Sequence, residues 1–236
     1  MHITPISIPC HGYSIAADWH ETDNQNTVLL AIQGYASTKQ QNAPFISEIS
    51  EGSGISTLAI DLSGHGESPF NLNDTTPAQH LLEVATAFDW LVAQHPSADV
   101  YVMGTSYGGY MAAWLSHFRD FEKLVLRTPA IYKPEDFYTP HGQIEKAEQL
   151  ALYRNNSVAV KNNPIFQQAS IFTGESLVLV HGLDADVPLP TSNAYTEAFN
   201  AEEYIAEGFY HAYRSEQNPD EKREVYKTAL IAWLLK

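Results

Sequence analysis

The chain has 236 residues and a formal net charge of -15, from 28 acidic and 13 basic residues, and 44% of its residues are hydrophobic. This length and apolar content suit one domain with a sizeable core and exclude a disordered chain. Because so negative a surface repels nucleic acids and anionic lipids, we expect no nucleic-acid or membrane partner, and we interpret the scattered charges as a solvated surface.

Short apolar runs alternate with helical patterns along the chain. Two alternating segments around His11 and Gly12 predict an antiparallel hairpin at the start. Apolar runs predict strands at residues 27–32, 55–60, 100–103, 123–126 and 177–180, with a weaker strand at 203–206. Helical spacing predicts helices at about residues 40–50, 77–92, 110–118 and 225–235.

This alternation predicts an α/β fold whose central sheet is mostly parallel and carries helices on both faces. Ligands bind such sheets at the carboxyl ends of the strands. We therefore expect the residues that carry chemistry in the loops that follow the strands.

Residues 128–174 interrupt the alternation of strands and helices. They contain four prolines, six aromatic residues and a helical stretch from Ile144 to Tyr153. A long insertion between two core strands often forms a lid over a site. We predict a single domain spanning residues 1–236 with a lid or cap at 128–174, and an ordinary surface excursion is the alternative.

The segment Gly104-Thr105-Ser106-Tyr107-Gly108 lies between a predicted strand and a predicted helix. A serine hydroxyl becomes a useful nucleophile only when it is exposed, aimed and paired with a base. A strained strand-to-helix turn can hold the hydroxyl above the sheet, and the flanking glycines avoid collisions with neighbouring backbone. The five-residue pattern is weak alone, but its position predicts that Ser106 is the nucleophile of a serine hydrolase.

This turn and four further segments resemble the α/β-hydrolase family. Gln33-Gly34-Tyr35 follows the first buried strand, where that family usually has His-Gly. Residues 61–68, Asp-Leu-Ser-Gly-His-Gly-Glu-Ser, are similar to the family's Asp-x-x-Gly-His-Gly-x-Ser loop. Residues 181–188 resemble the loop that carries the catalytic acid, and residues 208–211 resemble the loop that carries the base. The resemblance spans residues 27–236 and implies the α/β-hydrolase fold with a serine-histidine-aspartate triad.

The base must accept the Ser106 proton, and imidazole has a pKa in the right range. The resemblance places His211 in this role. For the acid that orients the imidazole, the family pattern selects Asp184, four residues before Pro188. The turn after Gly182 is shorter than is usual in the family, so Asp186 remains an alternative acid.

An oxyanion hole needs two backbone N–H groups aimed at the carbonyl oxygen. We expect Tyr107, at the start of a helix, and Tyr35 to supply them, and the side chains of both to border the acyl pocket. His65 and His181 are expected to shape neighbouring loops. The remaining histidines lack a partner pattern in the sequence, and no His or Cys clustering indicates a metal.

We therefore expect a carboxylesterase that cleaves a small-molecule ester through an acyl-enzyme, with no cofactor. A thioesterase or small peptidase would use the same triad, and a ligand-binding protein could keep the fold without catalysis. Cys10 is the only cysteine, so no disulfide can form within the chain. We see no signal peptide and no apolar run of the roughly 18 residues that a membrane helix needs, which favours a cytoplasmic protein.

Overall fold

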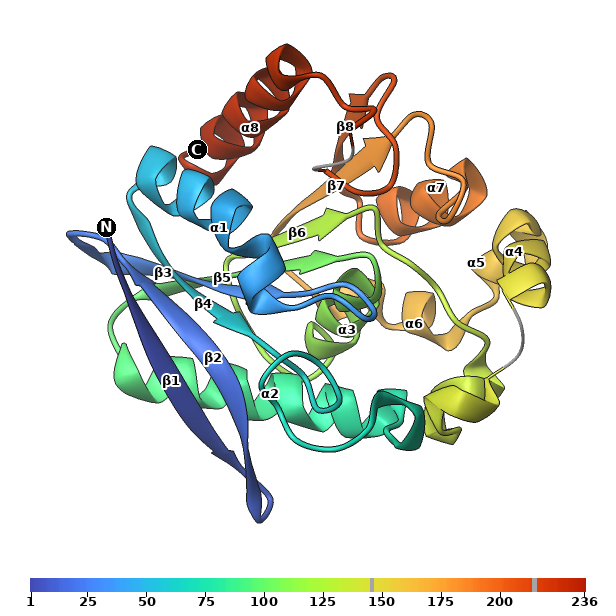
Figure 1. Ribbon diagram of the computed structural model, residues 1–236. Coiled ribbons are helices and arrows are strands. Elements are labelled where there is room, and N and C mark those ends of the chain that lie inside the picture. Colours follow the sequence, from blue (N-terminus) through green and yellow to red (C-terminus); the bar gives the residue numbers. More distant parts are fainter. Residues whose placement is uncertain (145–146, 214–215) are drawn as a thin grey trace.

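A twisted eight-stranded sheet runs through the computed structural model, which describes residues 1–144, 147–213 and 216–236 (Figure 1). The strand order is β1-β2-β4-β3-β5-β6-β7-β8. The bounds are β1 (His2–Cys10), β2 (Tyr13–Glu21), β3 (Asn24–Ile32), β4 (Ile55–Ile60), β5 (Asp99–Thr105), β6 (Lys123–Arg127), β7 (Glu175–His181) and β8 (Glu202–Ala206). The β1–β2 and β2–β4 pairs are antiparallel and all other pairs are parallel, which confirms the predicted sheet.

Helices cover both faces of this sheet. Helices α1 and α8 lie on one face, and α2 and α3 lie on the other (Figure 1). The bounds are α1 (Lys39–Ser53), α2 (Pro77–Gln94), α3 (Tyr107–Leu115), α4 (Ala147–Asn155), α5 (Ser157–Lys161), α6 (Pro164–Gln167), α7 (Leu189–Ala198) and α8 (Asp220–Leu234). Short 3-10 turns are η1 (Leu72–Asp74), η2 (Pro134–Tyr138), η3 (His141–Gln143) and η4 (Ala169–Ile171).

The apolar run at residues 28–32 of β3 follows from its place between the two helical layers. Successive side chains of a strand point to opposite faces of the sheet. Leu30 and Ile32 pack with α2 and α3, whereas Leu29 and Ala31 pack with α1 and α8. Both sets are buried, so the run at residues 28–32 has to be apolar, whereas Asn26 near the start of the strand is exposed.

Capping residues fix the ends of α1 and the start of α2. Thr38 and Gln41 form a capping box at the start of α1, and Gly54 ends the helix with a φ of 72°. Pro77 occupies the first turn of α2, after Thr76 as N-cap.

Outside the 128–174 segment, the structure differs from the sequence prediction at α3, α7 and α8. Helix α3 begins at Tyr107 instead of residue 110, because tight packing of its first turn overrides the low helix propensity of two glycines. Helix α8 begins at Asp220, five residues before the predicted start. Helix α7 was not predicted, because its buried face includes Thr191 and Ser192 and so lacks an apolar stripe.

Residues 128–174 connect β6 to β7 through η2, η3, α4, α5, α6 and η4. In Figure 1 this segment lies beside the carboxyl end of β6, with α4 and α5 next to α7. The first part of the predicted helical stretch differs, because Ile144 is extended and residues 145–146 lie outside the described residues. Helix α4 covers the rest of that stretch.

The turn between β5 and α3 brings backbone unusually close to backbone. Ser106 has φ 53° and ψ -112°, a left-handed conformation that costs a non-glycine residue on the order of 1–3 kcal/mol. A Cβ on Gly104 would lie 2.2 Å from the carbonyl oxygen of Gly108, and a Cβ on Gly108 would lie 2.2 Å from the carbonyl oxygen of Ile32. Only glycine therefore fits at these two positions.

Gly108→Ala tests this crowding against Gly52→Ala, since both glycines lie in helices and gain the same helix propensity. A Cβ on Gly52 meets only the flexible end of Ile231, whereas a Cβ on Gly108 meets backbone. We expect Gly108→Ala to lower the free energy of unfolding by about 1–3 kcal/mol and Gly52→Ala to leave it within about 1 kcal/mol, measured by urea denaturation. Equal effects would contradict the packing account.

Candidate active site

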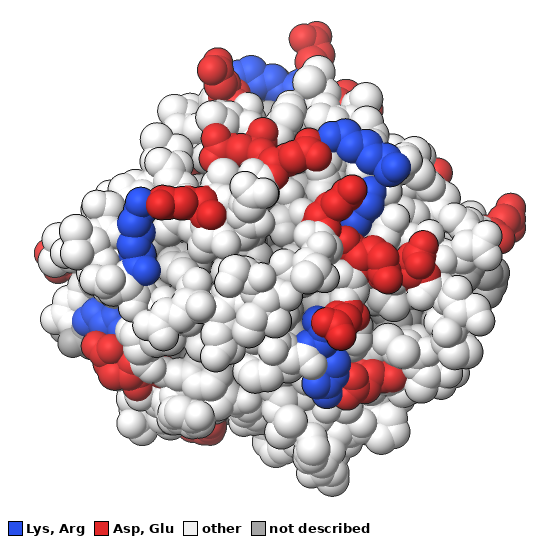
Figure 2. Space-filling view, turned by 180° about the vertical axis from the view of Figure 1, so that it is seen from behind, with Lys and Arg blue, Asp and Glu red and all other residues white. Residues whose placement is uncertain are grey.

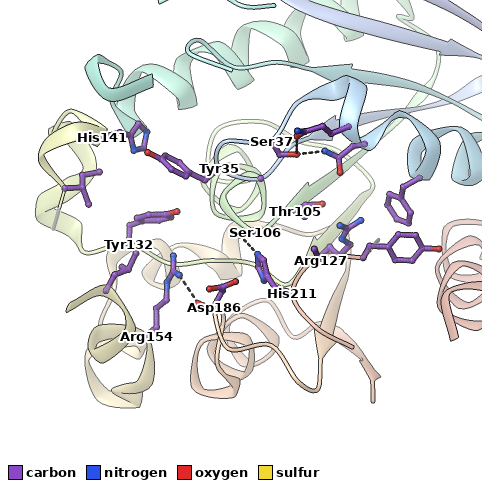
Figure 3. Close-up of a pocket in the computed structure, with 18 residues that line it drawn as sticks. Tyr35, Ser37, Thr105, Ser106, Arg127, Tyr132, His141, Arg154, Asp186 and His211 are labelled. Carbon is purple, nitrogen blue, oxygen red and sulfur yellow. Dashed lines mark hydrogen bonds between the residues drawn. The ribbon is translucent and has the colours of Figure 1, made fainter. Parts of the chain in front are cut away.

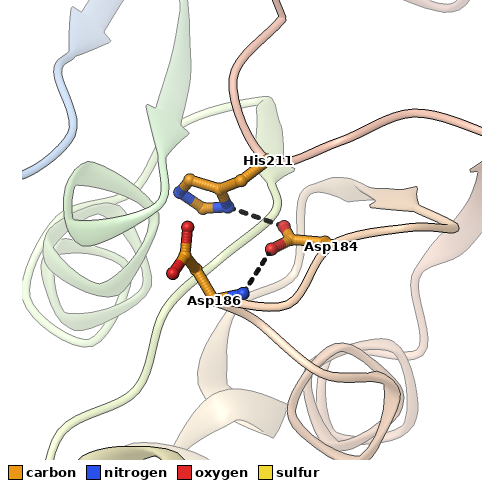
Figure 4. Close-up of side chains that lie close together, drawn as sticks. All are labelled: Asp184, Asp186 and His211. Atoms are coloured by element: carbon orange, nitrogen blue, oxygen red, sulfur yellow. Dashed lines mark hydrogen bonds and ion pairs between the residues drawn. The ribbon is translucent and has the colours of Figure 1, made fainter. Parts of the chain in front are cut away.

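Three loops at the carboxyl ends of the strands bring together Ser106, His211 and Asp184. Ser106 follows β5, Asp184 follows β7 and His211 follows β8. His211 Nε2 lies 3.0 Å from Ser106 Oγ, and His211 Nδ1 lies 2.6 Å from Asp184 Oδ2 (Figures 3 and 4). The sequence prediction named these three residues, and the structure joins them in one chain of hydrogen bonds.

Asp184 and Asp186 differ in what their carboxylates contact. The Asp184 side chain is 1% exposed, and its second oxygen accepts hydrogen bonds from the backbone N–H groups of Asp186 and Val187 at 2.9 Å each. The Asp186 side chain is exposed and points toward the His211 ring without a hydrogen bond to Nδ1 (Figure 4). Asp184 is thus the carboxylate that holds the imidazole, and the short turn after Gly182 supports it through backbone donors.

The same three groups, Asp184, Asp186 and His211, have ligand-type atoms within 4.8 Å of one another. A carboxylate–histidine cluster of this kind can hold a divalent cation. However, His211 already uses both ring nitrogens, one toward Asp184 and one toward Ser106. Coordination of a metal by His211 would break one of these hydrogen bonds.

The backbone N–H groups of Tyr35 and Tyr107 both lie next to Ser106. Tyr107 follows Ser106 directly, and a Cβ built on Gly34, the neighbour of Tyr35, would lie 3.6 Å from Ser106 Cβ. Among the described residues, neither N–H group donates to another protein atom. Two unused donors beside one hydroxyl can stabilise a negative oxygen.

The two tyrosine side chains take different places. Tyr35 lines the cavity in front of Ser106, as expected. The Tyr107 side chain is fully buried and does not line it, which differs from the expectation. Its hydroxyl donates to His80 Nδ1 at 2.7 Å and lies 3.3 Å from His141 Nε2, so the ring is held inside the fold.

His80 and His141 form a buried cluster that the sequence analysis did not identify. Burial lowers the pKa of His80 to about 3 and that of His141 to about 4, so both rings are neutral near pH 7. His80 Nε2 donates to the Ser63 carbonyl at 2.9 Å. His80 lies at helical spacing on the buried face of α2, a signal that could have found it, whereas nothing in the sequence marks His141.

His65 lies in the loop after β4 and His181 is the last residue of β7, and both lie beside loops of the site, as expected from the sequence. His65 is buried, with Nδ1 3.2 Å from the Ser63 carbonyl oxygen. His181 Nδ1 donates to the carbonyl oxygen of Tyr210 at 2.8 Å and so braces the loop that carries His211. Burial, together with the nearby Arg127 charge, lowers the pKa of His181 to about 4.

A cavity of about 770 Å³ opens in front of Ser106 and His211. Figure 3 shows Tyr132, Arg154 and Asp186 on one side of His211, and Arg127 on the other. Three more residues of the 128–174 segment line the cavity, namely His141, Ile144 and Leu150. Neither arginine was identified in the sequence analysis, because an isolated arginine in a short helix or at a strand end carries no pattern.

Arg154 connects the 128–174 segment to the loop that carries Asp184. Its Nε donates to the Ile131 carbonyl at 3.1 Å, and its Nη1 donates to the Asp186 carbonyl at 2.8 Å. The guanidinium also lies 5.1 Å from the centre of the Tyr132 ring. These contacts form one wall of the cavity.

Within the described residues, no helix combines the length and apolar character needed to cross a lipid bilayer. Solved structures with the same fold include Est1E from Butyrivibrio proteoclasticus with ferulic acid bound, which is 18% identical, with a TM-score of 0.73 and 98% of each chain covered. An esterase from Pyrococcus furiosus is 19% identical, with a TM-score of 0.73, and the match covers 99% of this chain and 91% of that chain. A monoacylglycerol lipase from Paleococcus ferrophilus is 18% identical, with a TM-score of 0.71, and the match covers 94% of this chain and 98% of that chain.

No curated protein matches the sequence significantly. Residues 23–172 match the family described as serine aminopeptidase, S33, and include the turn that carries Ser106. The match covers more than half of the chain, and the sheet order and helical layers agree with the fold. The chain therefore belongs to this family of α/β-hydrolase serine hydrolases.

Proposed function

We propose that the protein is a carboxylesterase that cleaves small-molecule esters with Ser106 as nucleophile, His211 as base and Asp184 as the acid that orients it. The single observation that carries this proposal is the unbroken series of hydrogen bonds from Asp184 through His211 to Ser106. A base within hydrogen-bond reach of the nucleophile, itself oriented by a carboxylate, is the arrangement that acyl transfer requires.

In the first half of the reaction, Ser106 Oγ bonds to the ester carbonyl carbon while its proton moves to His211 Nε2. The carbonyl oxygen becomes an oxyanion, for which the Tyr35 and Tyr107 N–H groups are the proposed donors. The tetrahedral intermediate then breaks its bond to the alkoxy oxygen, which takes the proton from His211 and leaves as the alcohol. Ser106 is left as an acyl ester.

In the second half, a water molecule gives a proton to His211 Nε2 and adds to the acyl carbon. Collapse of that intermediate breaks the bond to Ser106 Oγ, which recovers its proton from His211 as the acid leaves. Asp184 keeps the imidazole oriented and stabilises the imidazolium in both halves. No redox step is involved, so no electron donor or acceptor is required.

The 128–174 segment is the proposed lid, and the observation that its residues line the cavity supports this role. Tyr132, His141 and Leu150 all face the space in front of Ser106. An apolar, aromatic wall of this kind suits an uncharged part of a small ester. The esterase and lipase structures of similar fold favour ester substrates, and thioester or amide cleavage are the alternatives that the assay separates.

A panel of p-nitrophenyl esters, matched acyl-CoA thioesters and p-nitroanilides tests the reaction class. We expect ester hydrolysis with the highest kcat/KM, and we expect Ser106→Ala to lower kcat at least about a thousand-fold because the nucleophile is absent. Circular dichroism of the variant checks that it is folded. A consistent preference for thioesters or anilides would overturn the choice of ester, and full activity of Ser106→Ala would overturn the mechanism.

Asp184→Asn and Asp186→Asn form a matched pair that tests the acid. We expect Asp184→Asn to lower kcat about a thousand-fold or more, because the imidazolium loses its partner and the favoured tautomer changes. Asp186→Asn keeps the backbone N–H that supports Asp184, so its kcat should fall less than about ten-fold. Steady-state kinetics on one ester give both values, and the reverse order would assign the acid to Asp186.

A further inference from the structure

One buried cation in the cavity has no role in the proposed mechanism. Arg127 is the last residue of β6, it is 4% exposed, and its side chain lines the cavity. Its position is tied to the nucleophile, because Arg127 pairs with Thr105 across the sheet and its carbonyl accepts the Ser106 N–H at 2.9 Å. The guanidinium therefore starts from the strand next to the one that carries Ser106.

Two aromatic rings flank the Arg127 guanidinium, and no acid in the described part of the chain pairs with it. Its central carbon lies 4.5 Å from the centre of the Phe45 ring and 5.7 Å from that of Tyr213. Nε has no hydrogen-bond partner, and no carboxylate among the described residues pairs with the side chain. Burial accordingly lowers the pKa of this guanidinium from its ordinary value.

Many other lysine and arginine side chains form ion pairs with acidic side chains. Figure 2 shows, on the face away from the view of Figure 1, blue Lys and Arg side chains beside red acidic ones. The ion pairs in the described residues include those of Arg119 with Asp89, Lys123 with Glu175, Lys161 with Glu197, Lys227 with Glu224, and Lys236 with Glu202. Arg154 and Lys222, for which no ion pair is seen in the described part of the chain, donate instead to backbone carbonyls. The Arg127 side chain has neither kind of partner among the described residues, and it faces the cavity.

The two sides of the cavity also differ in charge. On the side of the 128–174 segment, the cavity lining includes the carboxylate of Asp186, and the Arg154 guanidinium donates to the backbone carbonyls of Ile131 and Asp186. The α1 side of the cavity is lined by Gln41, Asn42 and Phe45 of α1 together with Arg127 and Tyr213, and none of these described residues is acidic. An anionic group would therefore be attracted to the α1 side.

We propose that the substrate of this site is an ester that carries a second, ionised carboxylate, and that Arg127 binds this carboxylate on the α1 side of the cavity. The proposal rests on the proposed esterase function and names its substrate class. A guanidinium flanked by rings keeps its N–H edge free, and the planar fork of that edge matches the two oxygens of a carboxylate. Because Phe45 and Tyr213 shield the guanidinium from water, a hydrogen bond formed there is electrostatically stronger than the same bond in water.

Matched esters test the preference in the wild-type protein. One set consists of mono-p-nitrophenyl esters of adipic, pimelic and suberic acids, and the other of p-nitrophenyl esters of monocarboxylic acids of the same lengths. Acetate esters of phenols with and without a ring carboxylate place the charge in the alcohol part instead. We expect the carboxylate ester to be favoured about ten- to hundred-fold in kcat/KM in at least one of these series. A preference for the uncharged ester throughout would overturn the proposal.

Arg127→Met tests whether Arg127 binds the substrate carboxylate or only supports the fold through its contacts with aromatic rings. We expect it to raise KM for the favoured carboxylate ester about ten- to hundred-fold while kcat/KM for the uncharged ester stays within about three-fold. Arg127→Lys should recover part of the preference, and Arg119→Met, which removes a distant charge, should keep it. Equal losses on both esters would mean that Arg127 only supports the fold.

Binding to Ser106→Ala distinguishes failure of this inference from failure of the esterase assignment. Isothermal titration with the same carboxylate ester and its uncharged partner measures affinity without turnover. We expect at least about ten-fold tighter binding of the carboxylate ester, lost when Arg127→Met is added. Tighter binding without hydrolysis by the wild type would overturn the esterase assignment alone, and hydrolysis without any preference would overturn the role of Arg127 alone.

Discussion

The positions of the other site residues depend on the crowded turn between β5 and α3. Ser106 adopts a left-handed conformation there, and Gly104 and Gly108 leave no space for a side chain. Hydrogen bonds from the flanking chain hold the strained residue, since Ser106 N–H donates to Arg127 and Ser106 O accepts from Ala130. The strain is tolerated because this turn is embedded between parallel strands, and it fixes the hydroxyl where a base from the last strand loop can reach it.

The site is surrounded by neutral histidine rings and contains one buried arginine, Arg127, that carries a positive charge. Burial keeps His80, His141 and His181 uncharged near neutral pH, so they contribute hydrogen bonds without charge. Arg127 keeps its charge inside a cavity whose only acidic lining residue, among those described, is Asp186. The surface charge of -15 repels anions at long range, but salt screens that repulsion over about 8–10 Å, whereas contacts inside the cavity are screened less.

The sequence predicts the sheet and the order of site loops well, because apolar runs and glycine turns are local signals. Asp184 is harder to choose from sequence, since only its backbone donors in the folded loop distinguish it from Asp186. Helix α7 (Leu189–Ala198) escapes detection because it buries small polar residues rather than an apolar stripe. His141 and Arg127 escape for a different reason, because their roles arise from segments that meet only in the folded chain.

Covalent labelling tests whether Ser106 is an activated nucleophile. Folded protein would be reacted with a fluorophosphonate probe, and the modified peptide identified by mass spectrometry. We expect one label per chain, on Ser106, which disappears in Ser106→Ala and after unfolding. Absence of labelling in protein shown to be folded by circular dichroism, or a label on a different residue, would contradict it.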